Sequence, residues 1–192
     1  MKAFRQAVFL VAAAALAGAA PARADWAPFG TYWENVARAA AQNDAALVQR
    51  LVGTGENPNQ TDENERTALH IAAINGNLQI VAILIKAHAK LDIKDKLGNT
   101  PLHYAAERNQ VETAQLLLDV GAAVDPENRD GRTPLMLAAS RGNIEVVQAL
   151  LAKGANPSKP DFTGRDAIGW AADSHKPGVI QALKRAAAAR RS

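Results

Sequence analysis

The 192-residue sequence contains no cysteine. Disulfide bonds, thiol nucleophiles, iron–sulfur clusters and a lipid-modified cysteine anchor are therefore excluded. Long hydrophobic runs are also missing after residue 20. The rest of the chain thus contains no sequence candidate for a membrane-spanning helix.

Motifs that carry catalysis are absent as well. The sequence has no G-x-S-x-G nucleophile elbow, no glycine-rich phosphate loop and no H-E-x-x-H zinc motif. Asp173, Ser174 and His175 combine the residue types of a hydrolase triad, but residues one and two apart on a helix point in different directions. His70 and His103 lack Cys or acidic partners at ligand spacing, which argues against a zinc site. We predict a non-enzymatic protein without a metal or a cofactor.

The first residues have the pattern of a secretory signal. Lys2 and Arg5 precede an apolar run over residues 7–20, and Ala22-Arg23-Ala24 fits an A-x-A cleavage site. We interpret residues 1–24 as a bacterial signal peptide. A retained anchor is the alternative, although the run is short and rich in alanine. Residues 25–192 are then expected in the periplasm, without a stable membrane anchor.

Removal of this segment changes the charge balance. The full chain has 22 basic and 19 acidic residues, and Lys2, Arg5 and Arg23 leave with the signal, so 19 of each sign remain. A neutral exported chain gives little support for nucleic-acid binding. The remaining length suits one domain.

One segment recurs at a fixed interval of 33 residues. Thr67, Thr100 and Thr133 each begin a T-[AP]-L sequence with an Ala-Ala pair after it, and Glu34 and Asp166 continue the register outward. A fixed period of this length indicates stacked helical repeats. The register predicts one domain over 25–192 with repeats at about 31–63, 64–96, 97–129, 130–162 and 163–192.

The recurring motifs resemble those of the ankyrin repeat family. The similarity covers about residues 31–185, and its outer two copies are degenerate. It implies an all-α ankyrin-repeat solenoid of about five stacked helix-turn-helix repeats with β-hairpin finger loops. The resemblance depends on the T-P-L-H-x-A-A opening, on Gly76-Asn77 and Gly142-Asn143, on Val146, Val147, Leu150 and Leu151, and on Gly121-Ala122 and Gly154-Ala155.

Local physical chemistry supports the same helices. Thr at a helix start caps free N–H groups, and Pro at the next position loses nothing because its missing N–H would be unpaired there. The helical period predicts a first helix over 101–109 in one repeat and a second helix over 144–153 in the next.

Glycines punctuate the repeat. Gly76 and Gly142 suit the turn between the two helices of a repeat, because glycine adopts backbone conformations that bulkier residues resist. His88 stands where Gly121 and Gly154 close their helices. This departure predicts either a looser first finger or a different turn.

Aromatic residues cluster before the first full repeat. Trp26, Phe29, Tyr32 and Trp33 fall within eight residues. Terminal repeats expose a face that interior repeats bury. The cluster is therefore expected to cover the N-terminal end of the stack, and an aromatic partner site is the alternative.

We expect the protein to be a monomer.

The ankyrin resemblance implies that a partner contacts the finger tips before each repeat Thr and two exposed positions after each Ala-Ala pair. In this sequence, those positions form a concave face that begins acidic and becomes rich in arginine. Arginine is favoured at binding hot spots and matches carboxylates, so an acidic or mixed protein surface is the expected partner. Solvated charge that maintains solubility is the alternative. The predicted partner-binding residues are Arg66, Asn75, Lys96, Asn99, Glu107, Arg108, Arg129, Arg132, Arg141, Phe162 and Arg165.

These observations together predict a non-enzymatic protein–protein interaction module of the bacterial periplasm. Its layout resembles small exported bacterial ankyrin proteins associated with protection against peroxide, which implies support of a periplasmic catalase. The alternative function is that of an immunity or inhibitor protein that neutralises a secreted toxin.

Overall fold

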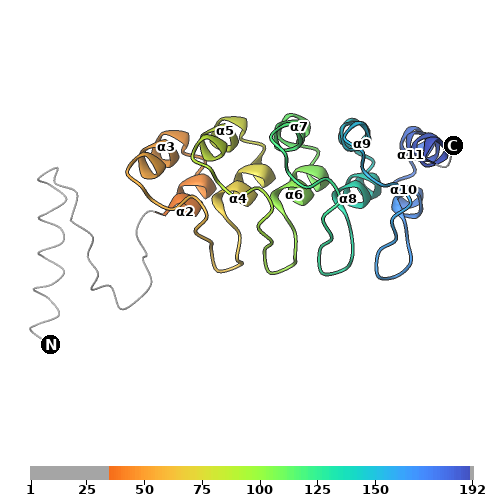
Figure 1. Ribbon diagram of the computed structural model, residues 1–192, viewed down its shortest axis with the longest axis horizontal. Helices are drawn as coiled ribbons and strands as arrows, with labels where there is room; N and C mark the ends of the chain where they lie inside the picture. Colours follow the sequence, from red (N-terminus) through yellow and green to blue (C-terminus); the bar gives the residue numbers. More distant parts are fainter. Residues whose placement is uncertain (1–34, 191–192) are drawn as a thin grey trace, which may run out of the picture. The chain divides into compact units, whose positions relative to one another are not determined.

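The computed structural model describes residues 35–190, and within them the chain folds into ten α-helices (Figure 1). The predicted signal peptide, the aromatic cluster from Trp26 to Trp33 and the start of the predicted first repeat lie outside the described residues. The helices are α2 Val36–Ala41, α3 Ala45–Gly53, α4 Ala68–Asn75, α5 Leu78–Lys86, α6 Pro101–Glu107, α7 Val111–Asp119, α8 Pro134–Arg141, α9 Ile144–Ala152, α10 Ala167–Ser174 and α11 Pro177–Ala189.

The ten helices form five antiparallel pairs that stack in a row in chain order (Figure 1). The first helices of the pairs, α2, α4, α6, α8 and α10, pack side by side as an inner layer next to the loops. The second helices, α3, α5, α7, α9 and α11, form the outer layer. This arrangement confirms the all-α solenoid of about five repeats.

Each central inner helix begins as its sequence predicts. Thr67, Thr100 and Thr133 are the N-cap residues, and each takes part in a capping box with the side chain three residues later. Pro at the next position is accommodated in α6 and α8 because a first-turn N–H has no helical partner. The helix expected over 101–109 ends at Glu107, and the helix expected over 144–153 ends at Ala152.

Left-handed residues close the helices at regular intervals. Gly76 and Gly142 have φ of 69° and 76°, as the turn between paired helices requires. His88 has φ of 56°, in the same left-handed region as Gly121 and Gly154. His88 therefore makes the same turn as its glycine equivalents, with the strain that a side chain adds there.

The loops that project from the inner layer are fingers of one shape, and no β-strand occurs among residues 35–190. In the first finger, the Asp62 amide donates to the Arg66 carbonyl, and a single antiparallel bridge joins Thr61 to Thr67. The expectation of β-hairpins is therefore corrected. Each finger is a tight turn in which a side-chain oxygen accepts from two backbone amides, and no strand is formed among the described residues.

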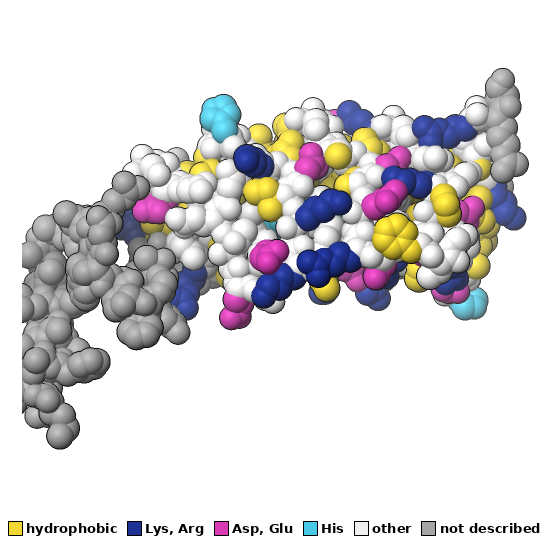
Figure 2. Space-filling model, turned by 60° about the horizontal axis from the view of Figure 1, so that its bottom comes forward, with side chains coloured by type: hydrophobic (Ala, Val, Ile, Leu, Met, Phe, Trp, Pro, Cys, Tyr) yellow, Lys and Arg dark blue, Asp and Glu magenta, His cyan; other side chains and the backbone are white. Residues whose placement is uncertain are grey.

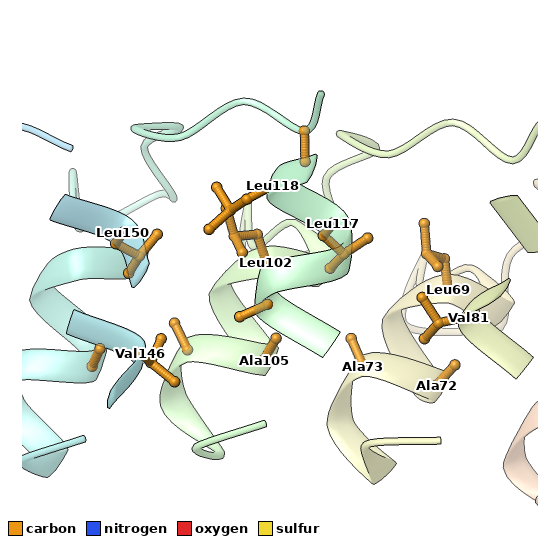
Figure 3. Close-up of a cluster of buried hydrophobic side chains, with 14 of the residues drawn as sticks. Leu69, Ala72, Ala73, Val81, Leu102, Ala105, Leu117, Leu118, Val146 and Leu150 are labelled. Carbon is orange, nitrogen blue, oxygen red and sulfur yellow. The ribbon is translucent and has the colours of Figure 1, made fainter. Parts of the chain in front are cut away.

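The core is a continuous stripe between the two helical layers. Leu69, Leu102 and Leu135 occupy the same position in three repeats, and each is 0% exposed. The small side chains of Ala105 and Ala106 are also fully buried, which lets neighbouring inner helices approach closely. Figure 3 shows Leu102 among Leu117 and Leu118 of the outer layer. Each repeat therefore depends on its neighbours for burial.

None of the helices within residues 35–190 has both the length and the hydrophobicity that crossing a bilayer would need.

Candidate protein-interaction face

The finger tips and the adjoining edge of the inner helices lie on one side of the stack (Figures 1 and 2). We name this surface the finger face. It comprises residues 62–66, 95–99, 128–132 and 161–165, together with the C-terminal ends of the inner helices. Charged side chains of both signs and several hydrophobic side chains gather on it (Figure 2).

One side chain holds each finger in shape. The Asp62 Oδ1 atom accepts hydrogen bonds from the backbone N–H groups of residues 64 and 66, at 2.8 and 2.9 Å. Asp95, Asn128 and Asp161 make the same pair of bonds in their own fingers. The sequence analysis did not select these residues. Their recurrence every 33 residues was the signal that could have identified them.

The Asp161 carboxylate accepts four hydrogen bonds. Burial alone would raise its pKa, but hydrogen bonds from the Thr163 hydroxyl, the Arg165 amide and the Trp170 indole outweigh burial and hold the pKa at about 2. In the second finger, Tyr104 donates its hydroxyl to Asp95 in the same way, at 2.5 Å. An inner-helix aromatic side chain thus fastens the finger to its own repeat.

Replacement of Asp161 by Ala is expected to lower the free energy of unfolding by about 1–3 kcal/mol, because four hydrogen bonds from partly buried donors lose their acceptor. Asp161→Asn is the matched control, since Asn128 holds the preceding finger with an amide oxygen. The Asn variant should retain the turn and lose the Trp170 bond, because the amide nitrogen cannot accept it. Urea unfolding measures the loss, and the NMR shift of the indole N–H reports the bond. Equal losses in both variants would contradict the role assigned to Oδ1.

Backbone hydrogen bonds join neighbouring fingers. The amides of Lys96, Arg129 and Phe162 donate to the carbonyls of Asn64, Leu97 and Asp130, respectively, at 3.0 to 3.2 Å. The four tips therefore form one continuous row.

Glycine lets each tip rest on the one before it. A Cβ atom on Gly98 would lie 2.7 Å from the Arg129 amide nitrogen, and one on Gly131 would lie 2.6 Å from the Phe162 ring. Both glycines also have positive φ, at 77° and 76°. The stem of Arg129 and the ring of Phe162 are thus seated on backbone that has no side chain.

Four of the predicted arginines are engaged within the protein. Arg66 pairs with Asp62 at 2.8 Å, Arg141 with Glu107 at 2.5 Å and Arg165 with Asp173 at 2.7 Å, and Arg132 pairs with Asp130. Glu107, which is itself a predicted contact residue, is thereby also occupied. The predicted arginine track is therefore largely neutralised by the protein's own carboxylates.

Two of these arginines also stack on an aromatic ring. The guanidinium carbon of Arg165 lies 4.4 Å from the ring centroid of Trp170, and that of Arg132 lies 5.5 Å from it. Arg165 additionally donates to the Gly169 carbonyl at 2.7 Å. Cation–π stacking adds to the ion pairs in holding both side chains in place. We assign Arg132 and Arg165 a structural role between the last two repeats.

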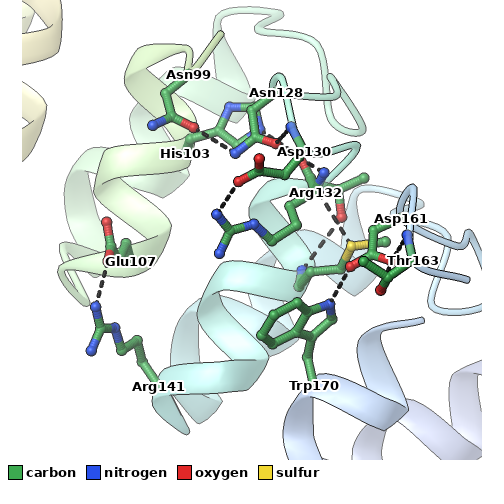
Figure 4. A network of polar contacts seen from close by, with 12 residues as sticks. Asn99, His103, Glu107, Asn128, Asp130, Arg132, Arg141, Asp161, Thr163 and Trp170 are labelled. Atoms are coloured by element: carbon green, nitrogen blue, oxygen red, sulfur yellow. Dashed lines mark hydrogen bonds and ion pairs between the residues drawn. The ribbon is translucent and has the colours of Figure 1, made fainter. Parts of the chain in front are cut away.

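Asn99 does not fit the prediction of an exposed contact residue. It is 8% exposed, its side-chain oxygen accepts from Asn128 at 2.9 Å, and its carbonyl bonds the ring of His70 (Figure 4 shows Asn99 beside Asn128). The finger position of Asn99 suggested exposure in the sequence, but side-chain packing between repeats buries it.

The remaining predicted residues are exposed and not paired. Among the described residues, the side chains of Asn75, Lys96, Arg108 and Arg129 make no hydrogen bond or ion pair. Phe162 is 72% exposed, and Leu97, on the second finger tip, is 62% exposed. The structure therefore separates a small set of available residues from the larger predicted set.

His70 and His103 join repeats through the backbone. The His70 Nδ1 atom accepts from the Thr67 amide at 3.1 Å, so its Nε2–H donates to the Asn99 carbonyl at 3.0 Å. His103 repeats the arrangement with Thr100 and the Arg132 carbonyl. Both imidazoles are fully buried and neutral, and burial lowers the pKa of His103 to about 4. Both histidines thus have a structural role between neighbouring repeats.

Within residues 35–190, no group of three or more His, Cys, Asp or Glu side chains is placed to hold a metal ion. A recess of about 250 Å³ lies by the α8–α9 turn and the start of α11, and Lys176 is the titratable residue in its lining. Its lining has no acid–base pair of the kind that hydrolytic catalysis uses.

The fold and the exposed finger face define a solenoid of helical repeats that presents a binding surface rather than a pocket. A family profile described as ankyrin repeats, in three copies, matches residues 36–130 and 120–190, and the chain belongs to this family. Ankyrin repeats are in general non-enzymatic modules that bind other proteins.

Parts of the repeat region are similar to plant proteins. A stretch of 59 residues is 39% identical to the potassium channel GORK of Arabidopsis thaliana, and 55 residues are 44% identical to its potassium channel AKT1. A third match is 35% identical over 60 residues to its serine/threonine-protein kinase 12. These matches cover 31%, 29% and 31% of this chain, but the chain spans only 7%, 6% and 13% of those proteins. The plant relatives lend no support to a bacterial origin or to export.

Proposed function

We propose that the protein is a periplasmic adaptor that binds another protein through its finger face. The observation that carries this proposal is the combination of exposed, unpaired cations with two exposed hydrophobic side chains on one row of finger tips. Arginine and large hydrophobic side chains held on a rigid surface are the residue types that protein-binding hot spots use. The partner that complements it has an acidic or mixed surface.

Export rests on the sequence of residues 1–24 alone. Its two early basic residues, its apolar run and its A-x-A site have the order of a secretory signal. The periplasmic part of the proposal fails if N-terminal sequencing of the protein from its native cells shows that Met1 to Ala24 are retained.

Two partner classes follow from the sequence resemblance. One is a periplasmic catalase, which would place the protein in peroxide defence. The other is a secreted toxin that the finger face would neutralise. A binding experiment distinguishes them by the identity of the captured protein. A toxin is also expected to bind very tightly.

The test is affinity capture from an extract of the source organism's exported proteins. The variant is Arg108→Glu with Arg129→Glu, which reverses two available cations on the finger face. The matched control is Lys86→Glu with Lys184→Glu, which reverses two exposed cations on the outer helices. We expect one protein to be captured by the wild type and by the control, and at least tenfold less of it by the finger-face variant. Equal capture by both variants would place the partner elsewhere.

Arg132 and Arg141 are unsuitable for charge reversal. Glu at these positions would face Asp130 and Glu107, which now neutralise the arginines. Loss of capture in such a variant would then mix loss of binding with repulsion inside the protein.

A further inference from the structure

The four large hydrophobic side chains that are exposed in the described part of the chain are not spread evenly. Leu78 and Val120 are 42% and 41% exposed, whereas Leu97 and Phe162 are 62% and 72% exposed. Leu97 is on the second finger tip and Phe162 on the fourth. The two most exposed members thus flank the third finger.

Two unpaired cations lie in the same row. Lys96 precedes Leu97, and Arg129 is at the tip between the two hydrophobic residues. The Arg129 amide bonds the Leu97 carbonyl at 3.0 Å, so this cation is directly beside Leu97. Figure 2 shows Lys and Arg side chains near the middle of this face, with hydrophobic side chains to either side.

The exposed acidic residue of the third finger tip is already neutralised. The Asp130 carboxylate pairs with Arg132, and the Asp130 carbonyl accepts from the Phe162 amide at 3.2 Å. The carboxylate therefore does not compete for Lys96 or Arg129. The middle of the row keeps an uncompensated positive charge.

Phe162 and Arg129 each rest against the preceding finger. The ring of Phe162 lies against the backbone of Gly131, and the stem of Arg129 lies against Gly98. Inter-finger hydrogen bonds hold both residues at their amides. Side chains that are fixed before binding lose less entropy when a partner arrives.

The spacing determines what can bind along the row. Neighbouring inner helices pack at about 8–10 Å. Leu97 and Phe162 are about two repeats apart, so they are separated by about 16–20 Å, which is the length of about five or six extended residues. An extended segment can therefore contact both hydrophobic side chains with its carboxylates over the cations between them.

We propose that the row of finger tips from Lys96 to Phe162 recognises an extended acidic protein segment that has an apolar residue at each end, about five or six residues apart. This inference rests on the proposed function and specifies its partner. Leu97 and Phe162 contact the apolar ends, and Lys96 and Arg129 contact the central carboxylates. Backbone phosphates alone would match the cations but would leave both hydrophobic anchors without a complement.

The test is a selection of random twelve-residue peptides, displayed on phage, on the immobilised full chain. Enriched peptides are then synthesised, and their affinity is measured by fluorescence anisotropy. We expect carboxylates in the centre of the enriched sequences and aliphatic or aromatic residues about five or six positions apart around them. Leu97→Ala and Phe162→Ala should each weaken binding about tenfold, as hot-spot truncations do. Lys96→Glu with Arg129→Glu should weaken it further and reduce its dependence on salt.

Leu78→Ala and Val120→Ala are the matched controls, because they truncate the other two exposed hydrophobic side chains. Their affinities should stay within about twofold of wild type. The inference would be overturned if no peptide is enriched, or if the enriched peptides lack acidic residues in their centre. It would also be overturned if truncation of Leu97 and Phe162 leaves the affinities unchanged, or if a single-stranded oligonucleotide binds more tightly than the peptides. Peptides that bind and respond to Arg108→Glu but not to the two anchors would overturn it while leaving the finger face as the binding surface. The proposed function is tested separately by the capture experiment. Equal capture by the Arg108→Glu, Arg129→Glu variant and the Lys86→Glu, Lys184→Glu control would contradict it.

Discussion

Replacement of Leu102 by Ala will lower the free energy of unfolding by about 2–5 kcal/mol. Leu102 is 0% exposed and lies in the central repeat, where side chains of both helical layers surround it (Figure 3). Removal of its isobutyl group loses hydrophobic transfer free energy and leaves a cavity that the flanking helices cannot close without losing their own contacts. Because solenoid repeats stabilise one another through nearest-neighbour interfaces, the loss will affect both halves of the stack.

Leu97→Ala is the control for this experiment, because it makes the same substitution five residues earlier at a side chain that is 62% exposed. Its effect on the free energy of unfolding should stay within about 0.5 kcal/mol. Urea unfolding followed by far-UV circular dichroism measures both variants. Similar midpoints for Leu102→Ala and wild type would show that the stack does not depend on this interface.

Acidification from pH 7 to pH 4 will lower the free energy of unfolding through the two buried histidines. Burial lowers the pKa of His103 from 6.5 to about 4, against the opposing effect of its bond to the Arg132 carbonyl, and burial also lowers the pKa of His70. As the pH falls, the two histidines therefore become protonated in the unfolded chain at a higher pH than in the folded protein. The stability is complete above about pH 6.5 and is lost progressively as the pH falls to about 4.

The expected loss from His103 is about 3 kcal/mol, which is the free-energy equivalent of its pKa shift. Burial causes this shift. Protonation of Nδ1 would also remove the acceptor that the Thr100 amide uses at 3.0 Å. The carboxylates of Asp161 and Asp62 also have lowered pKa values, about 2 for Asp161, and their stabilisation is lost mainly below about pH 4, because the unfolded carboxyl groups titrate near 3.8. Most of the loss between pH 6.5 and pH 4 is therefore expected from the imidazoles.

The chain itself supplies the control for this pH dependence. Met136 occupies the histidine position in the next repeat, where its sulfur accepts the Thr133 amide at 3.4 Å. The double variant His70→Met, His103→Met should unfold with nearly the same free energy at pH 6.5 and at pH 4.5. Urea unfolding at each pH measures the change in the free energy of unfolding between the two pH values. A change as large as that of the wild type would assign the acid sensitivity to groups other than the two histidines.

Most of the fold could be predicted from the spacing of Thr67, Thr100 and Thr133. The threonine caps, the Pro residues after them and the paired alanines act within one or two helical turns, so their effects are local and readable. Finger shape was less predictable. The expected hairpins are tight turns, because a side-chain oxygen such as Asp95 Oδ1 satisfies the amides that strand pairing would otherwise use.

The site was predicted only in outline. The repeat register placed the finger tips correctly on one face, but it treated every exposed-looking charge as available. Whether Arg141 is available depends on Glu107, which is 34 residues away in sequence, and the burial of Asn99 depends on the neighbouring finger. Contacts at such separations depend on how repeats stack, and the period alone does not show which side chains meet.

The sequence by itself determined that this protein is a stack of helical repeats, because capping, helix propensity and a 33-residue hydrophobic period are all local properties that recur. Only the tertiary structure decided which residues of the finger face are free to bind. Local folding brings Arg66 and Arg132 next to carboxylates of their own fingers and Arg165 next to Asp173, eight residues away. Stacking pairs Arg141 with Glu107 of the preceding repeat, and Lys96, Arg129, Leu97 and Phe162 stay exposed on one row. The physical reason is that ion pairing and burial between repeats depend on distances in space, which the order of residues along the chain does not specify.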